Sequence, residues 1–585
     1  MYLERINGPE DIKKLNVDEL KVLSSEVRDA VINRISKIGG HQGPNLGVVE
    51  LTVALHYVFS SPVDEFVFDV SHQCYPHKIL TGRKDAFTDD NHFRDVTGYT
   101  NPKESVHDKF LVGHTSTSIS LALGLAKARD LKKEKRNVIA IIGDGSLSGG
   151  QAFEALDYAG EYDKNLIIVV NDNDQSIAEN HGGLYKTLKE LRENNGECEN
   201  NYFKSLGLDY VYCDDGNDVE VLIKELKKIK DIDHPIVFHV HTIKGKGLAY
   251  AEKEKERFHA GGPFNIEDGT PKYKGNEDNY IRDSLIKILE EDPASLLVNA
   301  ATPGGLGFDD QIRKKYRDRG QFIDVGIAEE NGVSLVGAAS RGGANAIFAT
   351  FAPFFQRTYD QMSHDTCLND SPATYLILSP GVYGMNSATH IALCDIQMFS
   401  HIPNLIYLAP AYKEEYLAML EYASKQKEHP IAIRVPRLTY SNKKDETDYS
   451  IRNRYKMEQF GEDVAIIAVG ELVPLAMEVA KKIKKETGKE ITVINPHFLS
   501  GYDELALGFL YNTHHHVITI ESGEKFGGFG SNISSFFADS NVKVINLGLG
   551  KEFYNDFKAD ELLDQCGISL DKLFNLTKNL LEIKK

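Results

Sequence analysis

Two short polar sequences directly follow apolar strands and contain residue types that bind a metal ion. Gly143-Asp144-Gly145 comes after the apolar run Val138–Ile142, and Asn171-Asp172-Asn173 comes after the apolar run Leu166–Val170. The carboxylate of Asp144 and the amide oxygen of Asn173 are hard oxygen ligands, which magnesium prefers together with phosphate oxygens. A Gly-Asp-Gly sequence alone is more often a plain turn, so the prediction depends on the second sequence and on the spacing between the two.

Both polar sequences are expected at the same edge of a parallel sheet. Asn173 follows Asp144 by 29 positions, which leaves room for one helix, near Gln151–Ala159, and one strand. In a right-handed βαβ unit, the carboxyl ends of adjacent strands meet at one edge, where open α/β sheets bind ligands. Glycines let the backbone approach a ligand closely. The amides of Gly145 and Ser146, which are expected to open the following helix, can receive a diphosphate.

This arrangement resembles the metal–diphosphate motif of thiamine diphosphate enzymes. In that class a backbone carbonyl two residues beyond the asparagine also binds the metal, which implies Gln175 here. Thiamine diphosphate reacts only after its thiazolium C2 proton is removed. A buried glutamate bonded to the aminopyrimidine ring promotes the tautomer that takes this proton. Such a glutamate needs a raised pKa, and desolvation raises the pKa of a carboxyl group.

A candidate for this glutamate follows an apolar strand in the second part of the chain. Glu329 stands in the sequence Phe322–Glu330, where the strand runs into an acidic turn. Taken alone, Glu329 would be interpreted as an acid at the start of a helix. The upstream motif makes it the predicted activator of the cofactor. Phe351 and Phe354 follow and are predicted to form an aromatic shelf, although aromatic residues in such a place more often belong to the core.

Short strands alternating with helices must position these residues. Three stretches of the chain show this alternation, so we predict an α/β fold of three doubly wound parallel-sheet domains. The predicted domains are residues 1–278, which bind the diphosphate and the metal, 279–445, which bind the pyrimidine ring, and 455–585. The polar segment 261–279 is predicted to be a linker or long loop, and a charged break covers 441–450. The other predicted strands are Ile236–Val240, Ala346–Thr350, Thr374–Leu378, Leu405–Leu408, Ile431–Val435, Val464–Val469, Ile491–Ile494, Val517–Ile520 and Val542–Leu547.

Composition and charge narrow the class of function. The 585 residues carry a formal net charge of −19, which argues against a nucleic-acid partner because phosphate backbones need a basic face. No apolar run reaches the ~18 residues of a membrane span, and the N-terminus does not read as a secretory signal. Six scattered cysteines without a CxxC pair are typical of a reducing compartment, so we expect a cytoplasmic protein. The triplet His514-His515-His516 is predicted to be a solvated turn rather than a metal site.

Longer sequences resemble the 1-deoxy-D-xylulose-5-phosphate synthase family. The resemblance covers essentially the whole chain, and the segment around His72 is long and specific; transketolase, a relative, matches that segment less well. The matching sequences are Gly40–Thr52, Ser71–Arg83, Gly113–Ser120, Lys244–Gly247, Phe258–Ala260, Phe354–Gln361 and Gly527–Ser531. The resemblance implies a transketolase-like fold, thiamine diphosphate and magnesium as cofactors, and a homodimer. It also implies that pyruvate and an aldehyde phosphate are the substrates, in isoprene and thiamine biosynthesis.

The resemblance assigns roles to individual residues. The implied metal ligands are Asp144, Asn173 and the carbonyl of Gln175. The implied cofactor-binding residues are His72, Gly113, His114, Thr115, Gly145, Ser146, Asn173, Phe351, Phe354 and Glu329. Glu329 is the implied catalytic carboxyl group, and the histidines that would line the reacting centre are His41, His259 and His390. Arg357 and Arg437 would grip the phosphate of the acceptor, a role suited to a planar guanidinium.

The chain departs from the family pattern mainly on the acceptor side. Ser379 replaces an arginine of the usual Asp-Arg-Ala-Gly sequence, and Asn386, a candidate substrate residue, replaces an acid. Three further departures lie elsewhere: Asn331 replaces a histidine, and Leu248 and Phe351 each replace a tyrosine. The acceptor half has therefore lost a cation and an acid. Loss of one charge-assisted phosphate contact costs roughly 1.5–3 kcal/mol, more than tenfold in acceptor binding.

Three functional hypotheses follow from these patterns. The first is condensation of pyruvate with glyceraldehyde 3-phosphate to 1-deoxy-D-xylulose 5-phosphate, with release of carbon dioxide. The second is a transketolase-like ketol transfer, or acyloin formation with a different aldehyde. The third is a non-catalytic homologue, against which the retention of Asp144 and Glu329 argues. The family implies a site within one chain in the synthase and between subunits in transketolase, and periodicity does not choose between them.

Overall fold

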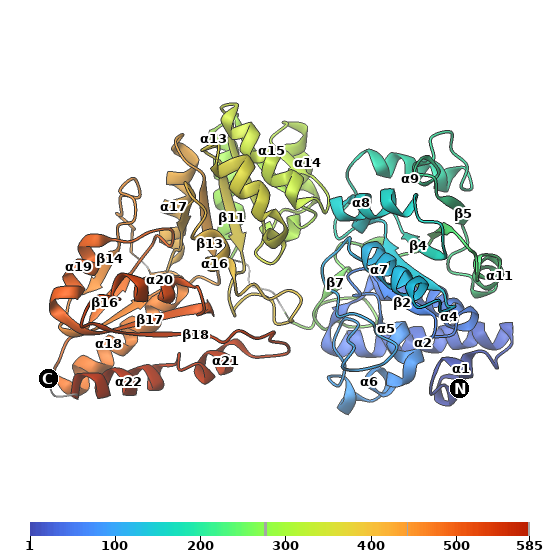
Figure 1. Cartoon of the computed structure of the whole chain (residues 1–585), viewed down its shortest axis with the longest axis horizontal. Coiled ribbons are helices and arrows are strands. Elements are labelled where there is room, and N and C mark those ends of the chain that lie inside the picture. The colour runs from blue at the N-terminus through green and yellow to red at the C-terminus, as the bar shows by residue number, and fades with distance from the viewer. Residues whose placement is uncertain (274–277, 442, 583–585) are drawn as a thin grey trace. The chain divides into compact units, whose positions relative to one another are not determined.

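The computed structural model describes residues 1–273, 278–441 and 443–582. Within this part of the chain there are two units of tertiary structure. Unit 1 comprises Met1–Asp278 with Val325–Ala328, and unit 2 comprises Asn279–Asp324 with Glu329–Lys585. Figure 1 shows the helices and strands of both units.

Unit 1 contains a five-stranded, fully parallel sheet with the strand order β2-β3-β4-β6-β5. Its strands are β2 (Glu65–Phe68), β3 (Val138–Gly143), β4 (Leu166–Asp172), β5 (Asp209–Cys213) and β6 (Pro235–His241). β3 and β4 are continuous apolar runs because helices cover both faces of the sheet, and this is the burial expected of parallel strands.

Side chains of β3 alternate between two hydrophobic cores. Ile139 and Ile141 pack in one core with residues of α2 (Val17–Ile38), α4 (Val49–Val58) and α11 (Val219–Ile229). Ala140 and Ile142 pack in the other core with α7 (Ser118–Leu131), α8 (Gly150–Ala159) and α9 (Gly183–Glu193). The labels of these helices can be followed around the sheet in Figure 1. The sheet of unit 1 is therefore doubly wound, as predicted.

Short elements carry the connections of unit 1. They are η1 (Leu3–Arg5), α1 (Pro9–Ile12), α3 (Gly43–Gly47), α5 (Tyr75–Lys78), η2 (Ile79–Arg83), α6 (Asp85–Thr88), η3 (Asp90–His92), η4 (Gly145–Ser148), α10 (Tyr202–Ser205) and α12 (Ala249–Lys253). A two-stranded antiparallel ribbon joins β1 (Gly40–His41) to β7 (Ala260–Gly261).

The segment 261–279, predicted to be a linker or long loop, belongs in part to the core of unit 1. Phe264 is buried in that core and forms a bridge with Pro271. The segment is therefore an ordered loop up to Tyr273, and residues 274–277 of the prediction lie outside the described part of the chain.

Unit 2 begins with a six-stranded, fully parallel sheet of the order β12-β13-β11-β10-β8-β9. Its strands are β8 (Ser295–Asn299), β9 (Phe322–Asp324), β10 (Asn345–Phe351), β11 (Thr374–Leu378), β12 (Ile406–Leu408) and β13 (Ile431–Val435). The helices and helical turns of this part are α13 (Tyr280–Glu291), η5 (Pro303–Leu306), α14 (Asp310–Asp318), α15 (Glu329–Arg341), η6 (Phe354–Thr358), η7 (Gln361–Cys367), α16 (Asp395–Phe399) and α17 (Lys413–Lys425). The charged break 441–450 includes residue 442, which lies outside the described residues.

The second sheet of unit 2 has the order β14-β16-β15-β17-β18. β15 (Asp463–Ala468), β16 (Thr492–Asn495), β17 (His514–Glu524) and β18 (Lys543–Leu549) run parallel, whereas the edge strand β14 (Lys456–Gln459) is antiparallel. β14 escaped the sequence analysis because Lys-Met-Glu-Gln has no apolar run. The helices are η8 (Gly470–Leu472), α18 (Val473–Thr487), α19 (Glu504–Thr513), α20 (Phe529–Phe536), α21 (Ala559–Gln565) and α22 (Leu570–Glu582). The predicted architecture of three doubly wound α/β sheets is confirmed, while the domain boundaries stay a prediction.

The prediction for His514–His516 was wrong. β17 begins at His514, and the His514 side chain is buried with its Nε2 2.9 Å from Thr492 Oγ1. His514 and His516 pair with the neighbouring strand β15. The triplet therefore belongs to a strand, and its first ring is structural.

None of the helices described is long and apolar enough to cross a lipid bilayer.

Candidate active site

The carboxyl edge of the unit 1 sheet brings Asp144 and the Asn171-Asp172-Asn173 sequence together. The final residue of β3, Gly143, pairs with Asn171 of β4, and the Asp144 amide donates to the Asn171 carbonyl at 3.1 Å. Asp144 Oδ2 accepts hydrogen bonds from the Gln175 amide at 3.0 Å and from Asn180 Nδ2 at 2.8 Å. The three predicted metal ligands thus belong to one loop cluster.

Two observations in this cluster match the chemistry of a cation site. Asn173 Oδ1 is a buried oxygen that lacks a hydrogen-bond partner among the described residues, which is a costly state for a buried acceptor. Burial, with the nearby Asp172 carboxylate as a second cause, raises the pKa of Asp144 to about 7. A cation would satisfy the Asn173 oxygen and favour the ionised form of Asp144. The donor set of carboxylate, amide and backbone oxygens suits magnesium.

Arg192 of α9 holds the loop that carries Asn173. Its guanidinium donates to both oxygens of Asp172, at 2.8 and 2.6 Å, and to Asp174 Oδ1 at 2.6 Å. Burial alone would raise the pKa of Asp172, but the hydrogen bond from His239 and the charge of Arg192 lower it below its ordinary value. Arg192 therefore clamps the residues on both sides of Asn173. Arg192 was not predicted, because an arginine in an amphipathic helix carries no local signal in the sequence.

The backbone around Gly145 is packed closely, but it does not open an α-helix. Gly145–Ser148 forms a single 3-10 turn, η4, and the α-helix α8 starts only at Gly150. The expectation that Gly145 and Ser146 open the next α-helix was therefore wrong by one turn. A Cβ atom at Gly145 would lie 2.7 Å from Ser176 Oγ, so a side chain there would displace the neighbouring loop. Ser146 is buried, and its carbonyl accepts from Ser116 Oγ at 2.7 Å.

Three histidines predicted from distant sequences form one cluster in unit 1. The ring centroid of His41 lies 4.9 Å from that of His72 and 5.8 Å from that of His259, and the latter two are 5.4 Å apart. Asn45 links the segments, because its Nδ2 donates to the carbonyls of His41 and His72 at 2.8 Å each. Asn45 Oδ1 accepts from the Tyr75 amide at 2.8 Å. This role of Asn45 was not predicted from the sequence.

The electrostatics of this cluster favour neutral imidazoles. Burial and the positive charge of Lys244 lower the pKa of His41 to about 4. The same causes hold the pKa of His259 well below its ordinary value. Lys244 Nζ lies 3.1 Å from His259 Nδ1, and burial lowers the pKa of Lys244 itself to about 7. A neutral imidazole has one N–H donor and one bare nitrogen acceptor, so these rings can form hydrogen bonds with substrate oxygens near neutral pH.

The predicted cofactor loop of Gly113, His114 and Thr115 is fixed by Asp69, directly after β2. Asp69 Oδ1 accepts from the Ser116 amide at 2.8 Å, and its Oδ2 accepts from the Ser118 amide at 2.9 Å. Ser116 and Ser71, which precedes His72, both have left-handed backbones, with φ values of 73° and 64°. Non-glycine residues in this conformation are strained, and such strain clusters at functional sites.

In unit 2, Glu329 is the first residue of α15, as its position after an apolar strand predicted. Its side chain is only 2% exposed. Burial raises its pKa to about 7, and the opposing charge of Arg357, with Nη1 3.5 Å from Glu329 Oε2, limits the rise. A protonated or readily protonated carboxyl group is what a buried activator of an aminopyrimidine ring requires.

The remaining unit 2 residues lie at the carboxyl ends of β10, β11 and β13. The ring of Phe354 lies 6.3 Å from that of Phe351 and 5.9 Å from that of His390. The Asn386 carbonyl accepts from the Asp556 amide at 2.9 Å, so a loop of the second sheet holds the acceptor loop. Arg437 is exposed after β13. The structure thus places Arg357 beside Glu329 and His390 beside Phe354.

The raised pKa of Glu329 predicts a pH-dependent stability. Between about pH 4.5 and 7 the folded protein binds more protons at this site than the unfolded protein, so stability falls as pH rises through that window. The loss amounts to about 3 kcal/mol for the shift to about 7. We therefore expect the difference in Tm between Glu329→Gln and the wild type to be more positive at pH 8 than at pH 5. Calorimetric scans without cofactor measure this difference. Burial also raises the pKa of Glu521 to about 7. Glu521 is present in both proteins, so its effect on the difference in Tm cancels. An equal difference in Tm at both pH values would contradict the assignment.

Comparisons with known proteins cover most of the chain. The 1-deoxy-D-xylulose-5-phosphate synthase family model matches residues 3–199 and 193–242. The models of the transketolase pyrimidine binding domain and the transketolase C-terminal domain match residues 278–443 and 454–573.

Curated relatives match over their full lengths. The 1-deoxy-D-xylulose-5-phosphate synthase of Alkaliphilus oremlandii is 36% identical in an alignment of 621 positions that covers 99% of each chain. The synthase of Caldanaerobacter subterraneus subsp. tengcongensis is 37% identical, over 97% of each chain. A crystal structure of transketolase from Campylobacter jejuni covers 97% of this chain and 100% of its own, at 18% identity and a TM-score of 0.44.

Proposed function

The chain belongs to the 1-deoxy-D-xylulose-5-phosphate synthase family, and from this premise we propose that it condenses pyruvate with glyceraldehyde 3-phosphate. The products are 1-deoxy-D-xylulose 5-phosphate and carbon dioxide. The observation that carries the proposal is the loop cluster of unit 1, where the buried Asp144 carboxyl group stands with the Asn173 oxygen that lacks a partner among the described residues. In unit 2, the buried Glu329 has the surroundings that the activator of an aminopyrimidine ring requires.

When bound, thiamine diphosphate supplies the nucleophilic carbon and the electron sink that decarboxylation of a 2-oxo acid requires. Asp144, Asn173 and the carbonyl of Gln175 would hold a magnesium ion on the diphosphate, and Arg192 keeps their loop in place. Glu329 would hold a proton at the aminopyrimidine ring, because burial raises its pKa to about 7 and so makes the carboxyl group easy to protonate at physiological pH. Phe351 and Phe354 would contact the ring by stacking.

The histidine cluster would handle protons and substrate oxygens. Burial and Lys244 lower the pKa values of His41 and His259, so both rings would be neutral near pH 7 and would form hydrogen bonds with substrate oxygens. His390 would face the acceptor aldehyde, and Arg357 and Arg437 would bind its phosphate through paired hydrogen bonds. The proposal includes magnesium as the ion, a homodimer, a cytoplasmic location and domains bounded at 1–278, 279–445 and 455–585.

The direct test is turnover by the purified protein with thiamine diphosphate, magnesium, pyruvate and glyceraldehyde 3-phosphate. We expect carbon dioxide release and a product with the mass of 1-deoxy-D-xylulose 5-phosphate. Absence of carbon dioxide, both with and without the aldehyde, would overturn the proposal.

The acceptor loop favours one alternative, in which the cofactor chemistry is kept and the aldehyde differs. Asn386 replaces an acid and Ser379 replaces an arginine of the family pattern, and Ser379 has a left-handed backbone with φ 53°. A panel of phosphorylated and unphosphorylated aldehydes, scored by product mass, distinguishes a different acceptor from glyceraldehyde 3-phosphate. Strict preference for glyceraldehyde 3-phosphate would exclude the alternative.

A further inference from the structure

A buried group of four charged side chains in unit 1 has no role in the mechanism above. Lys78, Arg83, Glu104 and Asp108, here called the charged cluster, have side-chain exposures of 0%, 9%, 12% and 0%. Lys78 pairs with Glu104, and Arg83 donates to both oxygens of Asp108, at 2.7 and 3.0 Å, and to Glu104 at 3.3 Å. Buried ion pairs of this kind contribute little to stability but fix geometry when every partner is present.

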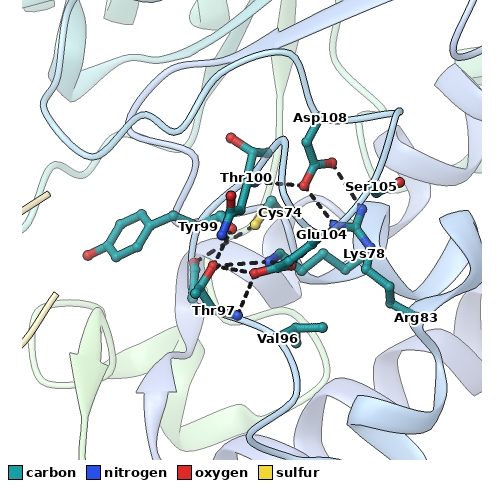
Figure 2. A network of polar contacts seen from close by, with 12 residues as sticks. Cys74, Lys78, Arg83, Val96, Thr97, Tyr99, Thr100, Glu104, Ser105 and Asp108 are labelled. Carbon is teal, nitrogen blue, oxygen red and sulfur yellow. Dashed lines mark hydrogen bonds and ion pairs between the residues drawn. The ribbon is translucent and has the colours of Figure 1, made fainter. Parts of the chain in front are cut away.

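The charged cluster clamps a short backbone segment, Thr97–Asn101, at both ends. Glu104 Oε1 accepts from the Thr97 amide at 2.8 Å and lies 2.7 Å from the Thr97 hydroxyl. Asp108 Oδ2 accepts from the Asn101 amide at 2.8 Å. Between these two points, the Thr100 amide donates to Ser71 Oγ at 3.0 Å. Figure 2 shows Glu104 and Asp108 on one side of the segment that carries Thr97, Tyr99 and Thr100.

Tyr99 lies in the middle of the clamped segment, and its ring points away from the charged cluster, as Figure 2 shows. The ring meets His41, with centroids 5.7 Å apart and planes at 69°. His41 thus has three ring neighbours in edge-to-face or near edge-to-face contact. Two are His72 and His259, which the mechanism already uses, and the third is Tyr99. Edge-to-face packing sets the relative orientation of rings.

We propose that the charged cluster is a positioning device that holds Tyr99 against His41, and that Tyr99 thereby sets the orientation of the His41 ring toward the substrate. The proposal rests on the proposed function, because it assigns His41 to the reacting centre. Glu104 and Tyr99 are positioning residues in this account. In this account the buried charges order the Thr97–Asn101 segment through several charge-assisted hydrogen bonds.

The first test separates the Tyr99 ring from its hydroxyl. Tyr99→Ala removes the ring and is expected to lower kcat with pyruvate about 10–100-fold, since a displacement of about 1 Å in a reacting group costs up to that much. Tyr99→Phe keeps the ring contact and is expected to stay within roughly twofold of the wild type. The Kd of thiamine diphosphate, measured by calorimetry, is expected to be unchanged in both. Equal losses in the Phe and Ala variants would overturn the role of the ring.

The second test cuts the clamp without leaving a buried charge unpaired. Thr97→Val loses the hydroxyl, which lies 2.7 Å from Glu104 Oε1 and 3.0 Å from the Tyr99 carbonyl, whereas Thr97→Ser keeps it. We expect Thr97→Val to lower kcat about threefold to tenfold, Thr97→Ser to restore it, and the double variant Thr97→Val/Tyr99→Ala to lose no more than Tyr99→Ala alone. Multiplicative losses in the double variant would show that Thr97 acts independently of Tyr99, against the proposal. Thr88→Val, a threonine outside the segment, is the matched control.

A third readout is independent of turnover. In protein labelled with 13C at the histidine ring, the His41 resonance is assigned by its loss in His41→Gln and is observed without cofactor. We expect it to move in Tyr99→Ala and in Thr97→Val, in the same direction, and to stay in place in Tyr99→Phe, Thr97→Ser and Thr88→Val. A His41 resonance unmoved by Thr97→Val overturns the positioning device even if the enzyme is active. A wild type that releases no carbon dioxide overturns the proposed function, while the resonance still decides the positioning.

Discussion

Glu329→Gln is expected to lower the turnover of pyruvate by about 10³-fold, in the range that loss of a general acid–base group costs. Glutamine has the size of glutamate and can accept a hydrogen bond, but it cannot hold and release the proton at the aminopyrimidine ring. The surroundings of Glu329 point to this role, since the side chain is 2% exposed and burial raises its pKa to about 7. Steady-state release of carbon dioxide measures kcat.

A second measurement isolates the step that Glu329 controls. The rate at which the C2 proton of bound thiamine diphosphate exchanges with deuterium, followed by NMR after acid quench, should fall in parallel with kcat. Glu330→Gln is the matched control, because Glu330 is the next residue and is only half-buried, and it should exchange at the wild-type rate. An exchange rate in Glu329→Gln within tenfold of the wild type would remove Glu329 from the role of activator.

Asp144→Ala is expected to weaken the binding of thiamine diphosphate in the presence of magnesium by at least about 100-fold. Loss of groups that only orient a metal ligand already costs about 10–100-fold in metal affinity, and Asp144 is proposed as a ligand itself. It also leaves the Gln175 amide and Asn180 Nδ2 without their acceptor, so the loop of Asn173 loses its anchor. Calorimetric titration of thiamine diphosphate measures the change.

The controls for Asp144 distinguish a lost ligand from a damaged fold. Asp163→Ala alters a carboxylate of the same unit whose side chain is 83% exposed, and it should bind the cofactor as the wild type does. Removal of magnesium from the wild type by EDTA should reproduce the weak binding of Asp144→Ala, and added magnesium should restore only the wild type. If Asp144→Ala responds to magnesium as the wild type does, the ion is held elsewhere.

The sequence by itself determined the alternation of strands and helices and the edge at which chemistry is expected, although β2, β5 and β8 were not among the predicted strands. A strand that is covered on both faces is apolar at nearly every position, so runs such as Val138–Ile142 and Leu166–Val170 are visible without any tertiary information. The handedness of βαβ connections then places Asp144 and Asn173 at one edge. Glu329 was found for the same reason, because it follows an apolar strand and begins a helix.

Local pattern failed where a residue's surroundings came from distant parts of the chain. The antiparallel edge strand β14 is polar because one side of an edge strand meets solvent, so no apolar run marks it. His514 was predicted to be solvated because three consecutive histidines are polar, yet β17 starts there and buries the first ring against Thr492. Gly145 and Ser146 form a 3-10 turn whose geometry depends on its packing against Ser116 and Ser176.

Only the tertiary structure decided what holds the chemical groups in place. Four polar residues that have no distinctive sequence pattern do this, namely Arg192, Asn45, Asp69 and Glu104. Their roles appear only when the fold brings their partners, up to tens of positions away, within hydrogen-bonding distance. A side chain that does chemistry stands at the end of one strand or the start of one helix, so the sequence pattern of that element reveals it. A side chain that holds a reactive residue in place does so through contacts between several elements. The sequence carries no local record of which elements will meet.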